Sequence, residues 1–155
     1  MTDSPKSNAK VLFRVPNEDG TDEVETLWAT HLESDKYKLE NSPFWAYGVS
    51  WEDIVLAPFA ADEGFPTFYS VVSKSGNRTI RVAFDPPIEE GNESDQILQG
   101  LLALGCSYEG ANRKYISINI PPVVKLDEIR NYLIQQDATW EHADPTYEEL
   151  FPENA

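Results

Sequence analysis

The alternation of apolar and polar residues divides the chain into a strand-rich first half and a second half in which helices and strands follow one another. Short runs rich in Val, Leu, Phe and Tyr, separated by turn residues, predict strands at residues 10–15, 23–32, 36–40, 53–59 and 67–74. Such a series is typical of a small half-open β-barrel, which we assign to residues 10–74. Residues 1–9 are polar and are expected to form a disordered lead-in.

The clearest hairpin signal lies at residues 67–84. The runs at 67–74 and 78–84 are both rich in β-branched and aromatic residues, and Ser75-Gly76-Asn77 separates them. Gly and Asn tolerate the positive φ that a three-residue hairpin loop requires. We therefore expect the two runs to pair with each other, so that the two halves of the protein share this hairpin.

From residue 79 onward the pattern predicts strand, helix, strand, strand, helix and strand. Asn92 or Ser94 can cap a helix that continues to residue 104, where Gly105 suits the C-terminus, and a second helix is predicted at residues 125–136. This order is that of the ferredoxin-like split βαβ (βαββαβ) arrangement, which we assign to residues 75–143. An acidic tail follows at residues 144–155. The predicted fold class is α+β.

Acidic residues outnumber basic ones along the whole chain. There are 27 Asp and Glu against 12 Lys and Arg, which gives a formal net charge of −15. Such a field repels phosphate backbones and anionic lipid headgroups, so we expect no nucleic acid and no membrane partner. It would speed association with a basic protein, although acidity also serves solubility alone.

Residue types that carry common catalytic or metal chemistry are sparse. Cys106 is the single cysteine, so no intramolecular disulfide can form, and one Cys with His31 and His142 cannot close a zinc site. Phosphate-binding glycine motifs and a G-x-S-x-G elbow are absent from the sequence. The acids Glu141 and Asp144 favour a protonated His142, which indicates a surface ion pair. We expect no catalytic residue, no metal and no cofactor.

The chain begins with a polar stretch and contains no long apolar run. The first ten residues lack the apolar core of a signal peptide, and no segment approaches the roughly 20 apolar residues of a spanning helix. The cytoplasm is therefore the expected location.

One segment, residues 41–51, carries four aromatic rings within eight residues. Trp and Tyr combine a large apolar surface with an N–H or O–H group, and Gly48 permits a conformation or a close approach that a side chain would block. In one interpretation the rings close the open end of the barrel. In the other they form a ligand pocket or a binding surface. The candidate partner- or ligand-binding residues are Asn41, Phe44, Trp45, Tyr47 and Trp51.

The same segment carries a motif, Asn41-x-Pro43-Phe44-x-Ala46-Tyr47-Gly48-Val49-Ser50, followed by Asp53-x-Val55. This motif resembles that of a bacterial family known as domain of unknown function 4265, and the resemblance covers about residues 10–143. The family is similar in its opening strand, in a Leu27-Trp28-Ala29 segment and in a hairpin at Ser75-Gly76, where this chain has Asn77 instead of the more usual His. The resemblance implies a domain outline and no mechanism.

We expect a non-catalytic protein that acts by binding another protein. An acidic immunity-type inhibitor of a basic partner is one concrete version, because complementary charge speeds association. The alternative is a small-molecule sensor or regulatory module that uses the aromatic loop as a pocket wall. An enzyme with a dispersed carboxylate site is the third possibility, and no sequence feature favours it.

Overall fold

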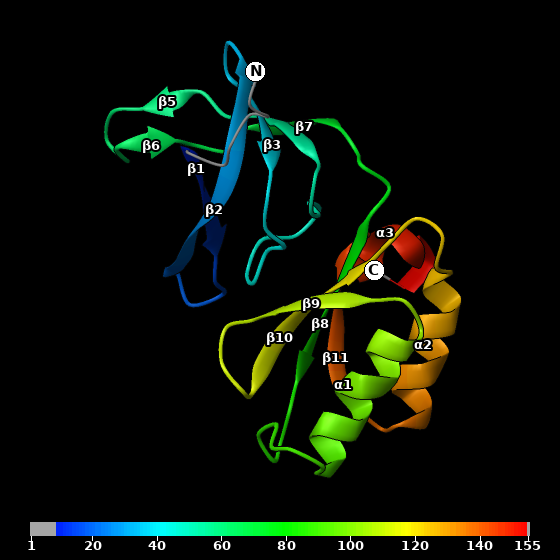
Figure 1. The fold of residues 1–155 in the computed structure, drawn as a ribbon. Coiled ribbons are helices and arrows are strands. Elements are labelled where there is room, and N and C mark those ends of the chain that lie inside the picture. The colour runs from blue at the N-terminus through cyan, green and yellow to red at the C-terminus, as the bar shows by residue number, and fades with distance from the viewer. Residues whose placement is uncertain (1–8, 155) are drawn as a thin grey trace, which may run out of the picture.

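The computed structural model describes residues 9–154 and contains two main antiparallel sheets, which Figure 1 shows one above the other. The first sheet has the strand order β1-β2-β3-β4-β7. Its strands are β1 (Ala9–Pro16), β2 (Asp22–Glu33), β3 (Lys36–Leu39), β4 (Ile54–Leu56) and β7 (Ser70–Ser73). A two-stranded arm, made of β5 (Phe59–Ala60) and β6 (Phe65–Pro66), extends from this sheet (Figure 1). Apart from Ala9, which begins β1, the expected lead-in lies outside the described residues.

Within residues 9–154 the first sheet is not closed into a barrel, because its edge strands β1 and β7 do not pair with each other. One parallel bridge joins Leu12 to Thr67, and the Phe68 N–H donates to the Leu12 carbonyl at 2.9 Å. The Phe68 ring stacks on that of Phe13 in the core of this sheet, with 4.8 Å between the ring centres. The half-open barrel predicted from the sequence is therefore not confirmed.

The second sheet has the strand order β11-β8-β10-β9, and two helices cover one of its faces (Figure 1). Its elements are β8 (Arg78–Ala83), α1 (Glu93–Ala103), β9 (Ser107–Gly110), β10 (Tyr115–Ile120), α2 (Leu126–Gln135) and β11 (Thr139–Asp144). A short helix, α3 (Tyr147–Leu150), and a 3₁₀ turn, η1 (Pro152–Asn154), follow. Asp144, assigned to the tail from the sequence, ends β11. The α+β class is confirmed.

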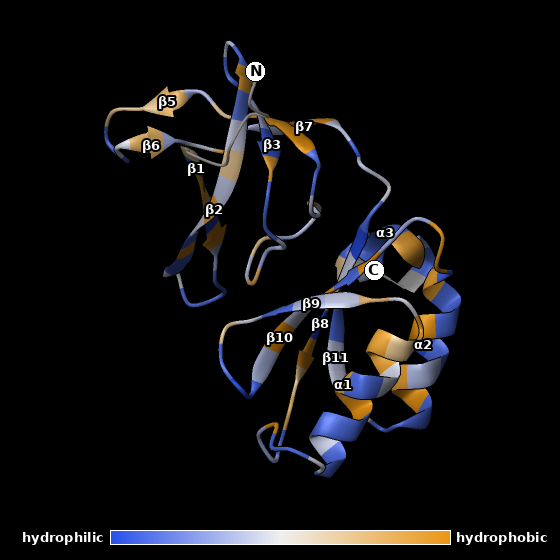
Figure 2. Cartoon of the chain, viewed as in Figure 1, coloured by the Kyte–Doolittle hydropathy of each residue, from blue (hydrophilic) through white to orange (hydrophobic). Residues whose placement is uncertain are grey.

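Apolar side chains from the helices and from one face of this sheet form its core. Figure 2 shows apolar residues along β8 and β10 and on both helices. The Asn92 side chain caps α1 by accepting from the Asp95 N–H, and Gly105 follows the helix with φ +105°, as the sequence predicted. The longest described helix, α1, has 11 residues, and none within residues 9–154 is long and apolar enough to cross a membrane.

The hairpin predicted at residues 67–84 is wrong. β7 pairs with β4 in the first sheet, whereas β8 pairs with β10 and β11 in the second. Residues 74–77 therefore connect the two sheets. The physical reason is that Asp53 accepts from the Ser75 N–H at 2.7 Å and binds Lys74, so the polar groups of the connection are turned toward the loop before β4.

The face of the second sheet opposite its helices is covered by the long connection between β3 and β4. Ile80 and Val82 of β8 pack in the helix-side core, yet Thr79 and Arg81 on the opposite face are also almost completely buried. Arg81 binds backbone carbonyls of residues 43–46, which shows what covers this face. The aromatic segment is thus the layer between the two sheets.

Candidate functional site

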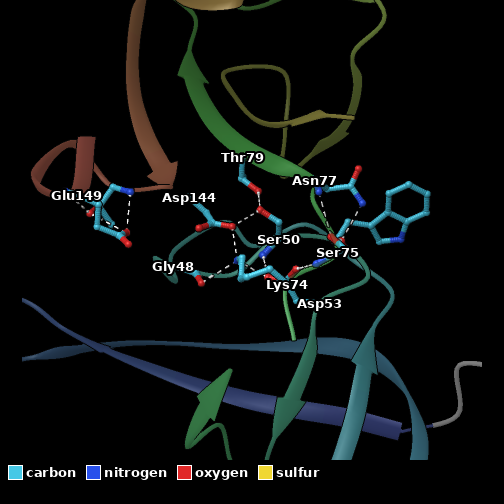
Figure 3. A network of polar contacts seen from close by, with 11 residues as sticks. Gly48, Ser50, Asp53, Lys74, Ser75, Asn77, Thr79, Asp144 and Glu149 are labelled. Atoms are coloured by element: carbon cyan, nitrogen blue, oxygen red, sulfur yellow. Dashed lines mark hydrogen bonds and ion pairs between the residues drawn. The ribbon is translucent and has the colours of Figure 1, made fainter. Parts of the chain in front are cut away.

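Ser50 and Asp53 of the 41–55 motif belong to a largely buried polar network between the sheets (Figure 3). Oδ2 of Asp53, which is fully buried, accepts from Lys74 Nζ at 2.5 Å and from the Ser50 N–H at 2.8 Å. Asp144 of β11 accepts from the same ammonium group at 2.5 Å. One lysine therefore bridges a carboxylate beside the first sheet and a carboxylate of the second.

The hydroxyl of Ser50 completes this network. It donates to Asp144 at 2.6 Å and lies 2.7 Å from the Thr79 hydroxyl. Lys74 has three N–H donors, and they contact Asp53, Asp144 and the Gly48 carbonyl. A nucleophilic serine needs an accessible hydroxyl and a free base, whereas Ser50 is fully buried and Lys74 has both carboxylates as partners. The arrangement is that of a joint between the two sheets.

Two further carboxylates hold the backbone of the aromatic segment. Glu25 of β2 accepts from the N–H groups of three consecutive residues, Phe44 at 2.9 Å and Trp45 and Ala46 at 2.7 Å each. Glu109 of β9 accepts from the Ser42 N–H at 2.5 Å and from the side-chain amide of Asn41 at 2.9 Å. Because one anchor comes from each sheet, the segment is held from both sides.

Arg81 holds the same segment from the second sheet. Its Nη1 donates to the Ala46 carbonyl at 2.7 Å and its Nε to the Glu141 carboxylate at 3.1 Å. The guanidinium lies 4.6 Å from the centre of the Tyr47 ring, and the Tyr47 hydroxyl donates to Glu141 at 2.8 Å. Partial burial and the nearby Glu141 carboxylate raise the pKa of Tyr47, so this phenol stays a hydrogen-bond donor. These contacts fix the Tyr47 ring.

The five residues predicted to bind a ligand or partner do not gather at one place. Asn41 also accepts from the Trp28 N–H at 2.8 Å, so it ties the segment to β2. Phe44 and Trp45 pack against Tyr115, with Trp45 stacked at 5.6 Å between ring centres. Trp51 lies on another side, in a small recess beside β9. Only Tyr47 lines the pocket described next.

A pocket of about 600 Å³ lies where the aromatic segment meets β11 and α3. Three aromatic rings from three separate parts of the chain contribute to it: Tyr47 before β4, Trp140 of β11 and Tyr147 of α3. Its remaining lining residues are Arg130, Glu141, His142, Thr146 and Glu148. Concave sites of this size with aromatic walls and a few polar groups are typical of small-molecule binding.

The polar end of the pocket is built around Arg130 and His142. Arg130 Nε donates to His142 Nε2 at 3.2 Å, so the neutral imidazole carries its proton on Nδ1. Nδ1 is buried and has no partner within the described part of the chain. Burial, together with the charge of Arg130, lowers the pKa of His142.

The surface ion pair expected for His142 is therefore wrong. The residue is only 7% exposed. Its acidic neighbours bind other partners, since Glu141 accepts from Arg81 and Asp144 accepts from Lys74. An acidic residue next to a histidine in the sequence need not be the partner of that histidine in the folded protein.

Sequence reasoning missed most of the residues that build the joint and the pocket. Arg81 alternates with Ile80 and Val82, which is the pattern of a solvent-facing position. Arg130 occupies an ordinary helical surface position, and no local pattern distinguishes Trp140 from other apolar strand residues. The one local signal is that Arg81 is the single polar residue of the run at 80–84.

A solved structure shares the fold of this chain, and a family model matches most of its sequence. A crystal structure described as that of a hypothetical protein from Neisseria gonorrhoeae matches with a TM-score of 0.75 and 14% identity, covering 95% of this chain and 99% of that one. At this identity the likeness shows a shared fold and nothing about activity. No curated protein matches the sequence. The family described as Domain of unknown function (DUF4265) matches residues 25–143, which confirms the resemblance and shows that the chain belongs to this family.

Proposed function

We propose that this protein is a non-catalytic binding protein that takes a small molecule into the pocket formed by Tyr47, Trp140 and Tyr147. The observation that carries the proposal is that Tyr47 meets Trp140 and Tyr147, which lie almost a hundred residues later in the chain, on one cavity of about 600 Å³. An ordinary core would bury such rings, yet 47% of Tyr47 and 44% of Tyr147 stay exposed. A ligand that covered them would remove apolar surface from water.

The rigidity of the pocket walls supports the proposal. Arg81 and Glu141 hold Tyr47, as described above. At α3, which contributes Tyr147, the helix begins with a capping box in which Thr146 and Glu149 exchange hydrogen bonds, and the centres of the Tyr147 and Phe151 rings lie 5.0 Å apart. Walls that are already ordered reduce the entropy lost when a ligand binds.

A thermal-shift screen of amino acids and nucleotides tests this function. A ligand at about 100 times its Kd should stabilise the fold by about 2.7 kcal/mol, which raises Tm by about 5–10 °C for a domain of this size. Tyr147→Ala should remove the effect of any hit. Tyr69→Ala is the matched control, because Tyr69 is 74% exposed and lies outside the pocket. A broad panel without a stabilising compound would count against the pocket.

A protein partner is the second candidate function. It is favoured by the β5–β6 arm, which projects from the first sheet (Figure 1) and leaves Phe59 66% exposed, and by the net charge of −15. An acidic immunity-type inhibitor would bind a basic partner through such a surface. A pull-down from the native host at low and high salt, with Phe59→Ser as the comparison, tests this. If the wild type and Phe59→Ser recover the same amount of partner, the arm is not the binding surface.

We also propose a more specific architecture for each half of the chain and a cellular location. The strand order β11-β8-β10-β9 with two helices on one face supports a ferredoxin-like unit in the second half. The Leu12–Thr67 bridge supports a half-open barrel in the first half. The lack of a disulfide framework supports a cytoplasmic location. A crystal structure and localisation of a tagged protein in its host test these assignments.

A further inference from the structure

We infer that the pocket takes a zwitterion with a planar apolar body, of the class of aromatic α-amino acids, with its carboxylate on Arg130, its ammonium on Glu148 and its ring among Tyr47, Trp140 and Tyr147. This inference rests on the proposed function, because it names the ligand class of the same pocket.

Arg130 is held in place as a carboxylate receptor. Its Nε donates to His142 at 3.2 Å, its Nη1 donates to Asp127 at 3.3 Å, and its guanidinium lies 4.9 Å from the centre of the Phe151 ring. A guanidinium has five N–H donors. These two bonds use two of them, so three have no protein partner within residues 9–154. A planar fork with free donors matches the geometry of a carboxylate.

Glu148 is the carboxylate of the pocket that is available to a cation. Glu141, the other acidic lining residue, accepts from Arg81 through Oε1 and from Tyr47 through Oε2. Glu148 lies in the first turn of α3, is exposed and has no hydrogen bond or ion pair among the described residues. Arg130 also forms an ion pair with Asp127 at 3.3 Å, but that carboxylate is exposed and leaves three guanidinium donors without a partner among the described residues. The pocket therefore offers one cation with open donors, Arg130, and one carboxylate with no partner in the described part of the chain, Glu148.

The charge of the whole protein selects among ligands that Arg130 could bind. A net charge of −15 disfavours the approach of phosphates, dicarboxylates and other anions. A zwitterion carries no net charge, so it avoids this repulsion and still provides a carboxylate for Arg130. The neutral His142 beside Arg130 adds no positive charge that would favour an anion. A zwitterion is thus the class of ligand that is compatible both with the charges in the pocket and with the net charge of the protein.

The three rings specify the body of the ligand. Arg81 covers one face of Tyr47, and Trp140 has an edge contact with His142 at 4.9 Å. Neither the Trp140 indole N–H nor the Tyr147 hydroxyl has a hydrogen-bond partner within the part of the chain that the structure describes. Aromatic walls favour a planar apolar group by offset stacking or edge contacts. Phenylalanine, tyrosine and tryptophan combine that group with both charges on one α-carbon.

The test is a calorimetric titration of the full chain with L-phenylalanine and two analogues. Phenethylamine lacks the carboxylate and 3-phenylpropionate lacks the ammonium group. Each analogue should bind at least about tenfold more weakly than L-phenylalanine, because each loses a charge-assisted contact. These titrations use the wild-type protein, so they do not depend on a variant that folds poorly.

Two variants assign each charge to its partner. Arg130→Gln should abolish the preference for L-phenylalanine over phenethylamine, and Glu148→Gln should abolish its preference over 3-phenylpropionate. Lys125→Gln and Glu153→Gln change exposed charges outside the pocket and should keep both preferences.

The possible outcomes distinguish a wrong ligand class from a pocket that binds no small molecule. If both analogues bind as tightly as L-phenylalanine, the zwitterion assignment is wrong and a binding pocket remains. If only compounds of another class from the screen bind, the assignment is equally wrong. If no compound of any class binds, the proposed function fails with it.

Discussion

The joint between the two sheets predicts a specific cost for Asp53→Asn. The carboxylate is fully buried, and its two oxygens accept from Lys74, from the Ser50 N–H and from the Ser75 N–H. Asparagine keeps one acceptor oxygen, but its NH₂ group must then face a donor. The ammonium of Lys74 would also lose one of its two carboxylate partners. The substitution therefore removes an ion pair and leaves at least one donor without an acceptor.

The magnitude follows from these contacts. A hydrogen bond to a charged group contributes about 1.5–3 kcal/mol, and breaking a buried ion pair by removing one partner costs about 3–5 kcal/mol. The Lys74 side chain is 42% exposed, so solvent screens this pair and the lower figure applies. We expect a loss of about 3 kcal/mol in the free energy of unfolding. In a domain of 155 residues this lowers Tm by about 6–12 °C.

Urea and thermal unfolding followed by circular dichroism measure this loss. Asp62→Asn is the matched control, because Asp62 is exposed and has no polar contact within the described residues. A double-mutant cycle with Lys74→Met should give a double variant that loses less than the sum of the two single losses, because the second substitution removes an already broken pair. An Asp53→Asn protein that melts within about 2 °C of the wild type would refute the reasoning.

Three other features of the fold give predictions of their own. Glu25→Gln should cost about 1.5–3 kcal/mol and speed hydrogen exchange at the amides of residues 44–46, which Glu25 holds; unchanged protection would contradict this. His142 has a lowered pKa in the folded state, so the unfolded chain takes up its proton first and stability should fall as pH decreases below about 6.5. In urea titrations at pH 7.5 and 5.5, His142→Asn should show a smaller decrease than the wild type, and equal decreases would argue against this role. Burial raises the pKa of Cys106 to about 11, so a thiol reagent at pH 7.5 should label it only after unfolding, and rapid labelling of the native protein would contradict its burial.

Local sequence patterns were sufficient to predict the helices and strands of the second half of the chain. The cap at Asn92, the glycine at Gly105 and the alternation of Ile116, Ile118 and Ile120 each report on a backbone conformation that neighbouring residues decide. The turn at Ser75-Gly76-Asn77 shows the limit of such signals. Turn residues specify that the chain changes direction, whereas Asp53, far earlier in the sequence, holds the segment that takes the chain to another sheet.

The pocket could not be predicted for a related reason. Tyr47, Trp140 and Tyr147 meet only because the aromatic segment is held between the sheets by Glu25, Glu109 and Arg81. The density of aromatic residues at 41–51 identified the segment, but it could not separate rings that pack from the one that lines a cavity. That distinction depends on which element covers each ring.

The central claim, that the pocket binds a small molecule of this class, is tested most directly by titrating L-phenylalanine into ¹⁵N-labelled protein. Trp140 lines the pocket, whereas Trp28 lies on β2 with the Lys10 ammonium group over its ring. The variant Trp140→Phe identifies the indole N–H signal of Trp140, because that signal is missing from its spectrum. We predict that the Trp140 indole signal and the amides of residues 140–148 shift with a saturating curve, while the Trp28 signal stays in place. A Trp140 signal that does not move at millimolar L-phenylalanine would contradict the account.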